Sequence, residues 1–279
     1  MQQEKRATSI TFFDLKSNLP KQSPWCWRIR LVLNYKNLKY KTQFVEGADI
    51  RTVSLQNEFE PTATNSDGSP RYTLPALIDE TDTSKPAIRI SDSERIVLYL
   101  ERTYPDANKP LFPSPFPPHN PNPALYLLLK QYTASALMPY INPLIVEEMI
   151  SKMDKKAMEK VKERLKVKNG TDDVGSFSVR DSEKEDTWKK LEEGFGLIDS
   201  LLKMGEEMRR FPDPEIENSD GRFEFFMGGQ ITYADLFMCG TLIMIQTASP
   251  EIVWGRIKTW NGGRWEKFLA SMEPYMIVC

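Results

Sequence analysis

Ser23-Pro24-Trp25-Cys26-Trp27-Arg28-Ile29-Arg30 predicts the start of a helix that runs to about Asn37. Serine is a favoured N-cap residue, and proline is tolerated at the first helical position because its missing N–H would have no partner within the helix. Just upstream, Ile10-Thr11-Phe12-Phe13 is short, β-branched and aromatic, which predicts a strand. Ser23 should therefore follow a strand's carboxyl end and lie among the free N–H groups of a helix start, which favour bound anions.

The residue types at Ser23 and Cys26 also suggest thiol chemistry. Cys-Pro-aromatic-Cys at a helix start is the dithiol motif of glutaredoxin-like proteins, in which the first cysteine is the reactive one. In this chain the first position is Ser23 and the fourth is Cys26. A serine cannot form a disulfide, but its hydroxyl can donate a hydrogen bond to a thiolate carried by another molecule. The alternative is that Ser23 only caps the helix.

Composition narrows the classes of function. The 279 residues suit one large domain or two ordinary ones, and the net charge of −2 argues against a nucleic acid or an anionic membrane as partner. The N-terminus lacks an apolar leader, and the apolar run from Leu236 to Ile245 is too short to span a bilayer. Cys26, Cys239 and Cys279 have no metal-binding or disulfide spacing, and His119 is the single histidine. We expect a cytoplasmic protein with no metal site.

The first hundred or so residues alternate between strand and helix patterns. After the first helix we expect a parallel strand at 40–45, a short helix at 49–56, a loop at 57–70, and a hairpin of strands at 74–78 and 87–90. Ser91 and Glu94 have capping-box spacing and should open a helix that ends before Pro105. The predicted order is β-α-β-α-β-β-α.

The remainder of the chain reads as helical. Pro105 to Pro123 contains eight of the twenty prolines and predicts an extended linker. Beyond it we expect a helix interrupted at Pro139 and Pro143, a helix ending near Lys168, a helix over 182–204, and an irregular insertion over 205–230. Thr232 and Asp235 then have capping-box spacing, and Ile231 with Leu236 has the spacing of a hydrophobic staple. They open an almost wholly apolar helix, which we expect to be central to a helical domain.

These features together resemble the glutathione transferase family. The motifs Ser-Pro-x-x-Trp from Ser23, Tyr72-Thr73-Leu74-Pro75 and Ser91-Asp92-Ser93 look most like the fungal FuA class, which is similar to bacterial lignin β-etherases. The resemblance implies a thioredoxin-like α/β domain over 1–104, a linker over 105–123, and an all-helical bundle over 124–279.

The resemblance also implies roles for single residues. Ser23 fills the position of the family's catalytic residue. Leu74 and Pro75 match a step with a cis peptide whose first residue pairs with the cysteinyl part of glutathione, and Asp92 and Ser93 match the pair that holds the γ-glutamyl end. Trp25 and Cys26 depart from the FuA motif, and so does the insertion over 205–230. Arg51 and Arg71 are the candidates for the anchor of the glycine carboxylate.

The predicted function is that of a glutathione transferase that activates its cosubstrate for attack on hydrophobic aromatic electrophiles, in detoxification and as a homodimer. We expect the acceptor pocket to use Trp25, Cys26, Tyr132 and Tyr140, with Phe112 and Phe116 of the linker nearby. Three alternatives remain open: glutathione-dependent cleavage of β-aryl ethers, a glutaredoxin-like reductase that uses Cys26, and a non-catalytic carrier of hydrophobic ligands.

Overall fold

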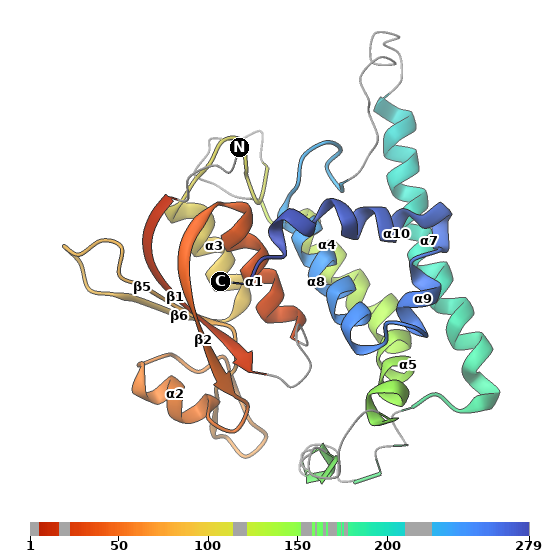
Figure 1. Cartoon of the computed structure of the whole chain (residues 1–279), viewed down its shortest axis with the longest axis horizontal. Helices are drawn as coiled ribbons and strands as arrows, with labels where there is room; N and C mark the ends of the chain where they lie inside the picture. The colour runs from red at the N-terminus through yellow and green to blue at the C-terminus, as the bar shows by residue number, and fades with distance from the viewer. Residues whose placement is uncertain are drawn as a thin grey trace. The chain divides into compact units, whose positions relative to one another are not determined.

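The computed structural model of the chain (Figure 1) describes residues 6–16, 23–113, 122–151, 158–159, 161–163, 166, 172–173, 175, 178–209 and 225–278. These residues form two compact units. The first unit comprises residues 1–123, 225–243 and 270–279, and the second comprises 124–224 and 244–269. Two segments that the sequence analysis placed in the helical domain therefore belong to the first unit, although the boundaries at 104 and 124 stay a prediction.

The first unit has the predicted order of strands and helices, with one small addition. Its elements are β1 (Arg6–Lys16), α1 (Pro24–Tyr35), β2 (Leu38–Glu46), α2 (Ile50–Gln56), β3 (Ala63–Thr64), β4 (Pro70–Arg71), β5 (Ala76–Asp79), β6 (Ile88–Ser91) and α3 (Ser93–Thr103). The segment predicted as a loop over 57–70 contains β3 and the start of β4, which pair with each other as a short antiparallel ribbon.

The main sheet has the strand order β2-β1-β5-β6. β1 is parallel to β2, whereas β5 is antiparallel to both β1 and β6. The predicted parallel pair and the predicted hairpin are therefore both confirmed. The parallel pairing follows from the helix that connects the two strands, because a crossover brings the chain back to the same end of the sheet.

The two faces of the sheet are covered by different helices. Phe13, Val45, Phe59 and Ala76 form an apolar cluster on one face, and side chains of α2 pack against it. α1 and α3 pack together along the sheet (Figure 1). Because side chains alternate along a strand, Phe12 points to the face opposite Phe13, and the guanidinium carbon of Arg30 in α1 lies 5.2 Å from its ring centroid.

α1 begins as predicted. Ser23 has extended backbone angles, and its Oγ accepts a hydrogen bond from the backbone N–H of Cys26. Pro24 is the first helical residue. Most of the helix is buried, and this includes Arg30, whose Nη2 lies 2.6 Å from Oδ2 of Asp14 in β1.

The predicted cap of α3 is wrong by one residue. Asp92, and not Ser91, is the N-cap: its Oδ1 accepts hydrogen bonds from the N–H groups of Glu94 and Arg95. Ser91 still belongs to β6, where it pairs with Ala76, and its hydroxyl donates to the carbonyl oxygen of Glu60. The strand pairing therefore removes Ser91 from the capping position and gives that position to Asp92.

Two later segments complete the first unit. The side-chain amide of Asn34 in α1 donates to the carbonyl oxygens of Tyr275 and Ile277, which ties the C-terminal segment to α1. The first part of α8 (Tyr233–Ala248) approaches α1 closely at Gly240. A Cβ at Gly240 would lie 2.9 Å from Cγ of Arg28, so only glycine permits this approach without a shift.

The start of α8 depends on Asp235, which is fully buried. Its Oδ2 accepts hydrogen bonds from the backbone N–H and the hydroxyl of Thr232, and its Oδ1 accepts one from the N–H of Phe226. The capping box expected from the spacing is therefore present in its reach-back half. Burial raises the pKa of Asp235 to about 6, even though these donors favour the charged form.

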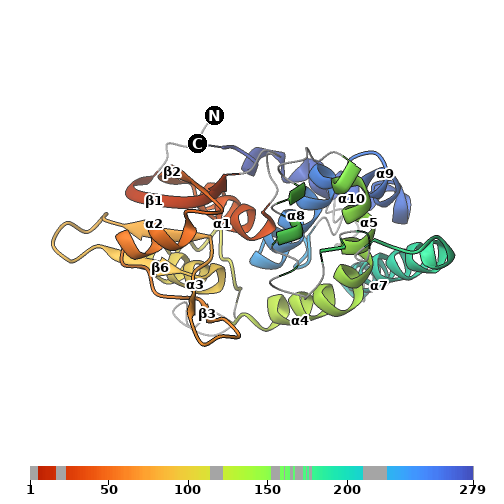
Figure 2. The same ribbon diagram turned by 90° about the horizontal axis from the view of Figure 1, so that it is seen from below.

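The second unit is helical (Figure 2). Its elements are α4 (Ala124–Tyr132), a π-helix (Thr133–Leu137), α5 (Met138–Ser151), a 3-10 turn (Asp181–Glu183), α7 (Lys184–Arg209), the end of α8, α9 (Val253–Ile257) and most of α10 (Trp260–Ser271). The chain is not broken at Pro143, which lies inside α5. Just before Pro139 the helix takes the wider π-helical form instead, over Thr133–Leu137. Pro139 has no N–H for the usual bond to the carbonyl four residues back.

Aromatic residues of α7 and α10 form much of the core of this unit. Phe195 stacks edge-on against Trp265 at a centroid distance of 4.9 Å, and Trp188 lies 6.3 Å from Trp260. The helix predicted over 182–204 is confirmed, but it continues to Arg209, so the first residues of the predicted insertion are helical. The rest of that insertion up to 224, and most of the helix predicted to end near Lys168, lie outside the described residues.

We expect the raised pKa of Asp235 to be visible in the pH dependence of stability. Because the folded protein holds this proton more tightly than the unfolded chain, the contribution is fully present below about pH 4 and is lost as pH rises through about 6. A change of about two pKa units corresponds to about 3 kcal/mol. Relative to Asp235→Asn, the free energy of unfolding of the wild type in urea should therefore fall between pH 4.5 and pH 7. Glu251→Gln, at an exposed carboxylate, is the control: its free energy of unfolding should change with pH as that of the wild type does. The same pH dependence for Asp235→Asn and the wild type would contradict the expectation.

Candidate functional site

The strand register brings the predicted site residues to one edge of the sheet. Phe13 of β1 pairs with Ala76 of β5, and Ala76 pairs with Ser91 of β6. The end of β1, the start of β5 and the end of β6 therefore share this edge. Pro75 and Asp92 are the next residues outward on their strands, and the chain that leaves β1 at this edge returns as the first turn of α1.

The hydroxyl oxygen of Ser23 already accepts one hydrogen bond. Its Oγ accepts the N–H of Cys26 at 3.3 Å, and its own carbonyl accepts the N–H of Trp27 at 3.0 Å. The hydroxyl proton of Ser23 has no acceptor among the described residues. Ser23 can therefore remain the cap of α1 while it donates a hydrogen bond to an anion at the helix start, a position that the helix dipole also favours.

Leu74 and Pro75 enter β5 through a cis peptide bond. Strand pairing begins only at Ala76, so the N–H and C=O of Leu74 have no partner among the described residues. The preceding residue is held in place, because the hydroxyl of Thr73 is 2.9 Å from that of Thr62. This edge can pair with the backbone of an extended peptide, as an added strand would.

Asp92 and Ser93 stand at the start of α3. Asp92 has a φ of 81°, in the left-handed region, and uses only Oδ1 to cap the helix. Its second carboxylate oxygen has no hydrogen-bond partner among the described residues and can bind a cation, while the N–H groups of the first helical turn favour an anion. The pair can therefore hold the two charges of an amino-acid head group.

Cys26 does not offer its thiol to a ligand. The residue has no exposed surface, and burial raises the pKa of its thiol, an effect that the nearby Asp14 carboxylate increases. A thiol in this state carries negligible thiolate at neutral pH. This burial opposes both roles predicted for Cys26, as a wall of an open acceptor pocket and as the nucleophile of a reductase.

The other predicted acceptor residues have different surroundings. Trp25 is 45% exposed beside Ser23. Tyr132 and Tyr140 belong to the second unit, where the hydroxyl of Tyr132 donates to the carbonyl of Gly194 at 2.7 Å. Their convergence with Trp25 stays a prediction. Phe112 is buried with its ring centroid 5.5 Å from that of Tyr233, so it serves the core of the first unit. Phe116 lies outside the described residues.

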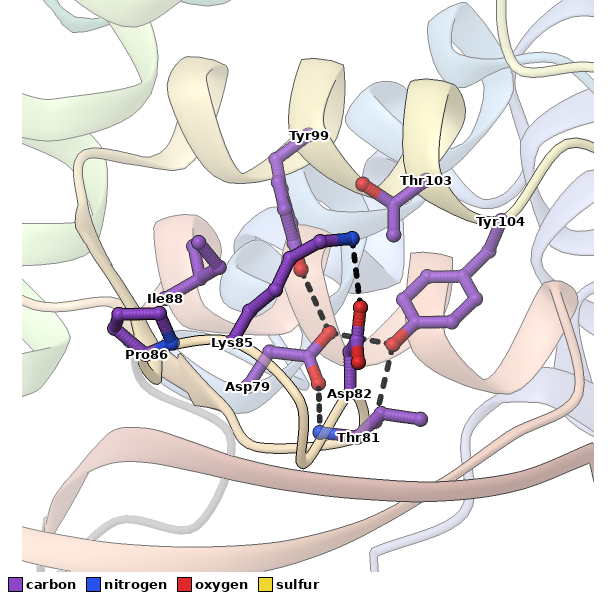
Figure 3. A pocket seen from close by; sticks show the side chains of 9 residues that line it. All are labelled: Asp79, Thr81, Asp82, Lys85, Pro86, Ile88, Tyr99, Thr103 and Tyr104. Atoms are coloured by element: carbon purple, nitrogen blue, oxygen red, sulfur yellow. Dashed lines mark hydrogen bonds and ion pairs between the residues drawn. The ribbon is translucent and has the colours of Figure 1, made fainter.

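A pocket of about 560 Å³ lies at the opposite end of β5, β6 and α3 (Figure 3). It contains none of the predicted site residues; its lining consists of Asp79, Thr81, Asp82, Lys85, Pro86, Ile88, Tyr99, Thr103 and Tyr104. Thr103 lies ten residues after Ser93 in α3, which corresponds to about 15 Å along the helix axis. The pocket is therefore separate from the edge that carries Ser23.

The buried carboxylate of this pocket has a structural task. Oδ2 of Asp79 accepts hydrogen bonds from the hydroxyls of Tyr99 at 2.8 Å and Tyr104 at 2.5 Å, and Oδ1 accepts the N–H of Thr81 (Figure 3). Burial, and then the bond to Asp79, raise the pKa of Tyr99. These bonds join the end of α3 to the hairpin. Both carboxylate oxygens of Asp79 are therefore used in structural hydrogen bonds and not in catalysis.

Sequence reasoning missed the two arginines of α1 that determine how the helix packs. Arg28 and Arg30 are both almost fully buried. The signal was present, because two arginines stand among apolar residues in a helix with no polar face. Among the described residues, no group of three or more His, Cys, Asp or Glu side chains could bind a metal ion, and no helix has the length and apolarity to cross a membrane.

A thioredoxin-like α/β unit in a chain that also carries a helical unit is the fold that the resemblance to glutathione transferases implies. The chain belongs to the glutathione S-transferase family: the family's N-terminal domain profile matches residues 22–103, and its C-terminal domain profile matches residues 124–275. The resemblance stated from the motifs is thereby confirmed.

Several known proteins are similar to this chain. Glutathione transferase GSTFuA3 from Phanerochaete chrysosporium has a TM-score of 0.74 and 28% identity over 97% of this chain and 98% of its own. The glutathione S-transferase CsGST63524 of Ceriporiopsis subvermispora, crystallised with glutathione, has a TM-score of 0.73 and 29% identity over the same shares. The glutathione S-transferase-like protein ustS of Aspergillus flavus is 39% identical over 111 residues, which is 38% of either chain. The match to ustS thus spans well under half of that protein.

We predict that Cys26 is unreactive in the native protein. Its burial should slow alkylation by iodoacetamide at least about 100-fold relative to the urea-unfolded chain, as measured by mass spectrometry of the Cys26 peptide. Ser84→Cys, in the exposed loop of the β5–β6 hairpin, provides a thiol that should react at a similar rate in both states. Rapid native alkylation of Cys26, or a mixed disulfide with glutathione at that residue, would support a reductase instead.

Proposed function

We propose that this protein is a glutathione S-transferase that binds reduced glutathione along the edge formed by the end of β1, the start of β5 and the end of β6. The observation that carries the proposal is the register Phe13–Ala76–Ser91, which brings Leu74 and Asp92 to the sheet edge from which the chain leads to Ser23. Membership in the family supports it, as does the glutathione present in the crystals of the Ceriporiopsis relative.

Each part of glutathione has a matching group. The cysteinyl residue would pair its backbone with the N–H and C=O of Leu74. The γ-glutamyl ammonium would bind the second oxygen of Asp92, and its carboxylate would bind at Ser93 and the start of α3. Arg51 and Arg71 are exposed and remain the candidates for the glycine carboxylate.

Ser23 would then activate the thiol. A free thiol has a pKa of about 8.5, so only a few per cent is ionised at neutral pH. A hydrogen bond from the Ser23 hydroxyl and the N-terminal field of α1 both favour the thiolate, and each pKa unit is worth about 1.4 kcal/mol. The thiol proton passes to solvent, the sulfur forms a bond to the electrophilic carbon, and the leaving group departs with its electron pair.

The proposed electrophiles are hydrophobic and aromatic, because the exposed ring next to Ser23 is the indole of Trp25. Detoxification in the cytoplasm as a homodimer completes the proposal. Cleavage of β-aryl ethers uses the same attack with a phenolate as leaving group, so it differs only in the acceptor offered.

Substitutions at Ser23 can separate the hydroxyl from the helix cap. Ser23→Ala should lower the turnover of 1-chloro-2,4-dinitrobenzene by roughly 10- to 100-fold, the loss of one charge-assisted donor. It should also lower stability by about 1 kcal/mol, because the cap is lost. Ser23→Asp keeps a cap without a donor and should lose activity with little loss of stability, whereas Ser23→Thr keeps both.

Calorimetry with reduced glutathione provides the decisive measurement for binding. We expect a heat of binding that Leu74→Pro, which removes the N–H at that position, reduces strongly. Absence of binding by the folded wild type at millimolar glutathione would contradict the proposal. It would favour the alternative of a non-catalytic carrier of hydrophobic ligands. Release of phenol from a fluorogenic β-aryl ether in a parallel assay would add ether cleavage to the activity.

A further inference from the structure

The side chain of Arg28 lies against two aromatic rings within the first unit. Its guanidinium carbon is 3.8 Å from the ring centroid of Phe237 and 4.1 Å from that of Trp25. At these distances the guanidinium is in stacking contact with both rings. Phe237 is buried whereas Trp25 is 45% exposed, so Trp25 is the solvent-facing member of this stack.

The stack is fixed from the side of α8. Nη2 of Arg28 donates to Oγ1 of Thr241 at 3.2 Å, and the hydroxyl of Thr241 donates to the carbonyl of Phe237 at 3.1 Å. Gly240 lies on the same helix, and its missing side chain leaves room for the Arg28 stem. Arg28 is only 4% exposed, so its position is set by packing and not by solvent.

Trp25 is the outermost layer of this stack. Trp25 and Arg28 are three residues apart in α1, so both point to the same side of the helix. Arg28 covers one face of the indole, yet Trp25 remains 45% exposed. The indole therefore keeps exposed area on which another flat group can stack, two residues from Ser23.

We propose that Arg28 is a positioning residue for the electrophile: it holds the indole of Trp25 as a platform on which a planar aromatic acceptor stacks. This inference rests on the proposed function and deepens it. A flat acceptor becomes the fourth layer of the stack, next to the thiolate at Ser23. The cation behind the indole favours neutral or electron-poor rings that carry negative substituents, such as nitroarenes, and disfavours cationic acceptors.

Kinetics test the proposal through the Michaelis constants. Arg28→Met keeps a long buried side chain but removes the flat cation. It should raise the KM for 1-chloro-2,4-dinitrobenzene about 3- to 10-fold and leave the KM for glutathione and kcat nearly unchanged. Arg28→Lys keeps the charge without the flat surface and should be intermediate. Arg102→Met, at an exposed arginine of α3, is the control and should have no effect.

A double-variant comparison isolates the link to Trp25. In a Trp25→Ala background, Arg28→Met should change the KM for 1-chloro-2,4-dinitrobenzene less than twofold, because the platform is already lost. Independent effects of the two substitutions would overturn the proposal. An unchanged KM in folded Arg28→Met would overturn it as well.

Fluorine NMR gives a readout that does not require activity. The chain has six tryptophans, so labelling with 5-fluorotryptophan should give six resonances, of which Trp25→Phe removes one. Titration with 1,3-dinitrobenzene, a planar and unreactive probe, should shift the Trp25 resonance, with about 3- to 10-fold weaker binding in Arg28→Met. No shift at Trp25 overturns the proposal whether or not the protein conjugates glutathione. If the Trp25 resonance shifts but the protein neither binds nor conjugates glutathione, the role of Trp25 as a stacking platform is supported and the proposed transferase function is refuted.

Discussion

The ion pair between Asp14 and Arg30 fixes α1 on the sheet, and the position of the candidate site follows from it. Nη2 of Arg30 binds Asp14 at the end of β1, while Nη1 donates to the hydroxyls of Tyr40 and Thr42 in β2. One guanidinium thus joins α1 to two strands. Removal of either partner of a buried pair costs about 3–5 kcal/mol, since the other charge remains buried. The fork of Arg30 allows little rotation of α1, so the direction in which its first turn points is set by contacts made two turns later.

The other end of the helix is held just as firmly. Lys36 forms an ion pair with Glu101 of α3 at 2.7 Å, and the other carboxylate oxygen of Glu101 accepts the N–H of Leu111. The carbonyl of Leu111 in turn accepts the N–H of Tyr233 at the start of α8. These bonds leave the first turn of α1 as the part with the least burial. For the proposed function, a rigid helix of this kind would preorganise Ser23 as a hydrogen-bond donor.

Local chemistry in the sequence was enough to predict the cap at Ser23, the order of elements in the first unit and the capping pair at Asp235. It failed where strand pairing or distant contacts decide the outcome. Ser91 has the spacing of a cap, but its pairing with Ala76 keeps it in β6. The sequence gives no local sign of what Arg28 packs against, because its partner Thr241 is 213 residues away in the sequence. The raised pKa of the Cys26 thiol likewise depends in part on Asp14, which belongs to another element.

The contrast between Ser23 and Cys26 is the physical basis on which the proposed function assigns the reacting thiol to glutathione and not to Cys26. Both residues belong to the first turn of α1, where the N-terminal field lowers the pKa of an accessible thiol. The pKa of Cys26 is raised instead, because burial and the Asp14 carboxylate favour its neutral form. Ser23 lies in the same field with a hydroxyl proton to donate, but a hydroxyl is a poor nucleophile without a general base nearby. The start of α1 therefore offers a donor and an anion-binding field while its own Cys26 is unreactive, which is why the proposed function has the sulfur arrive with glutathione.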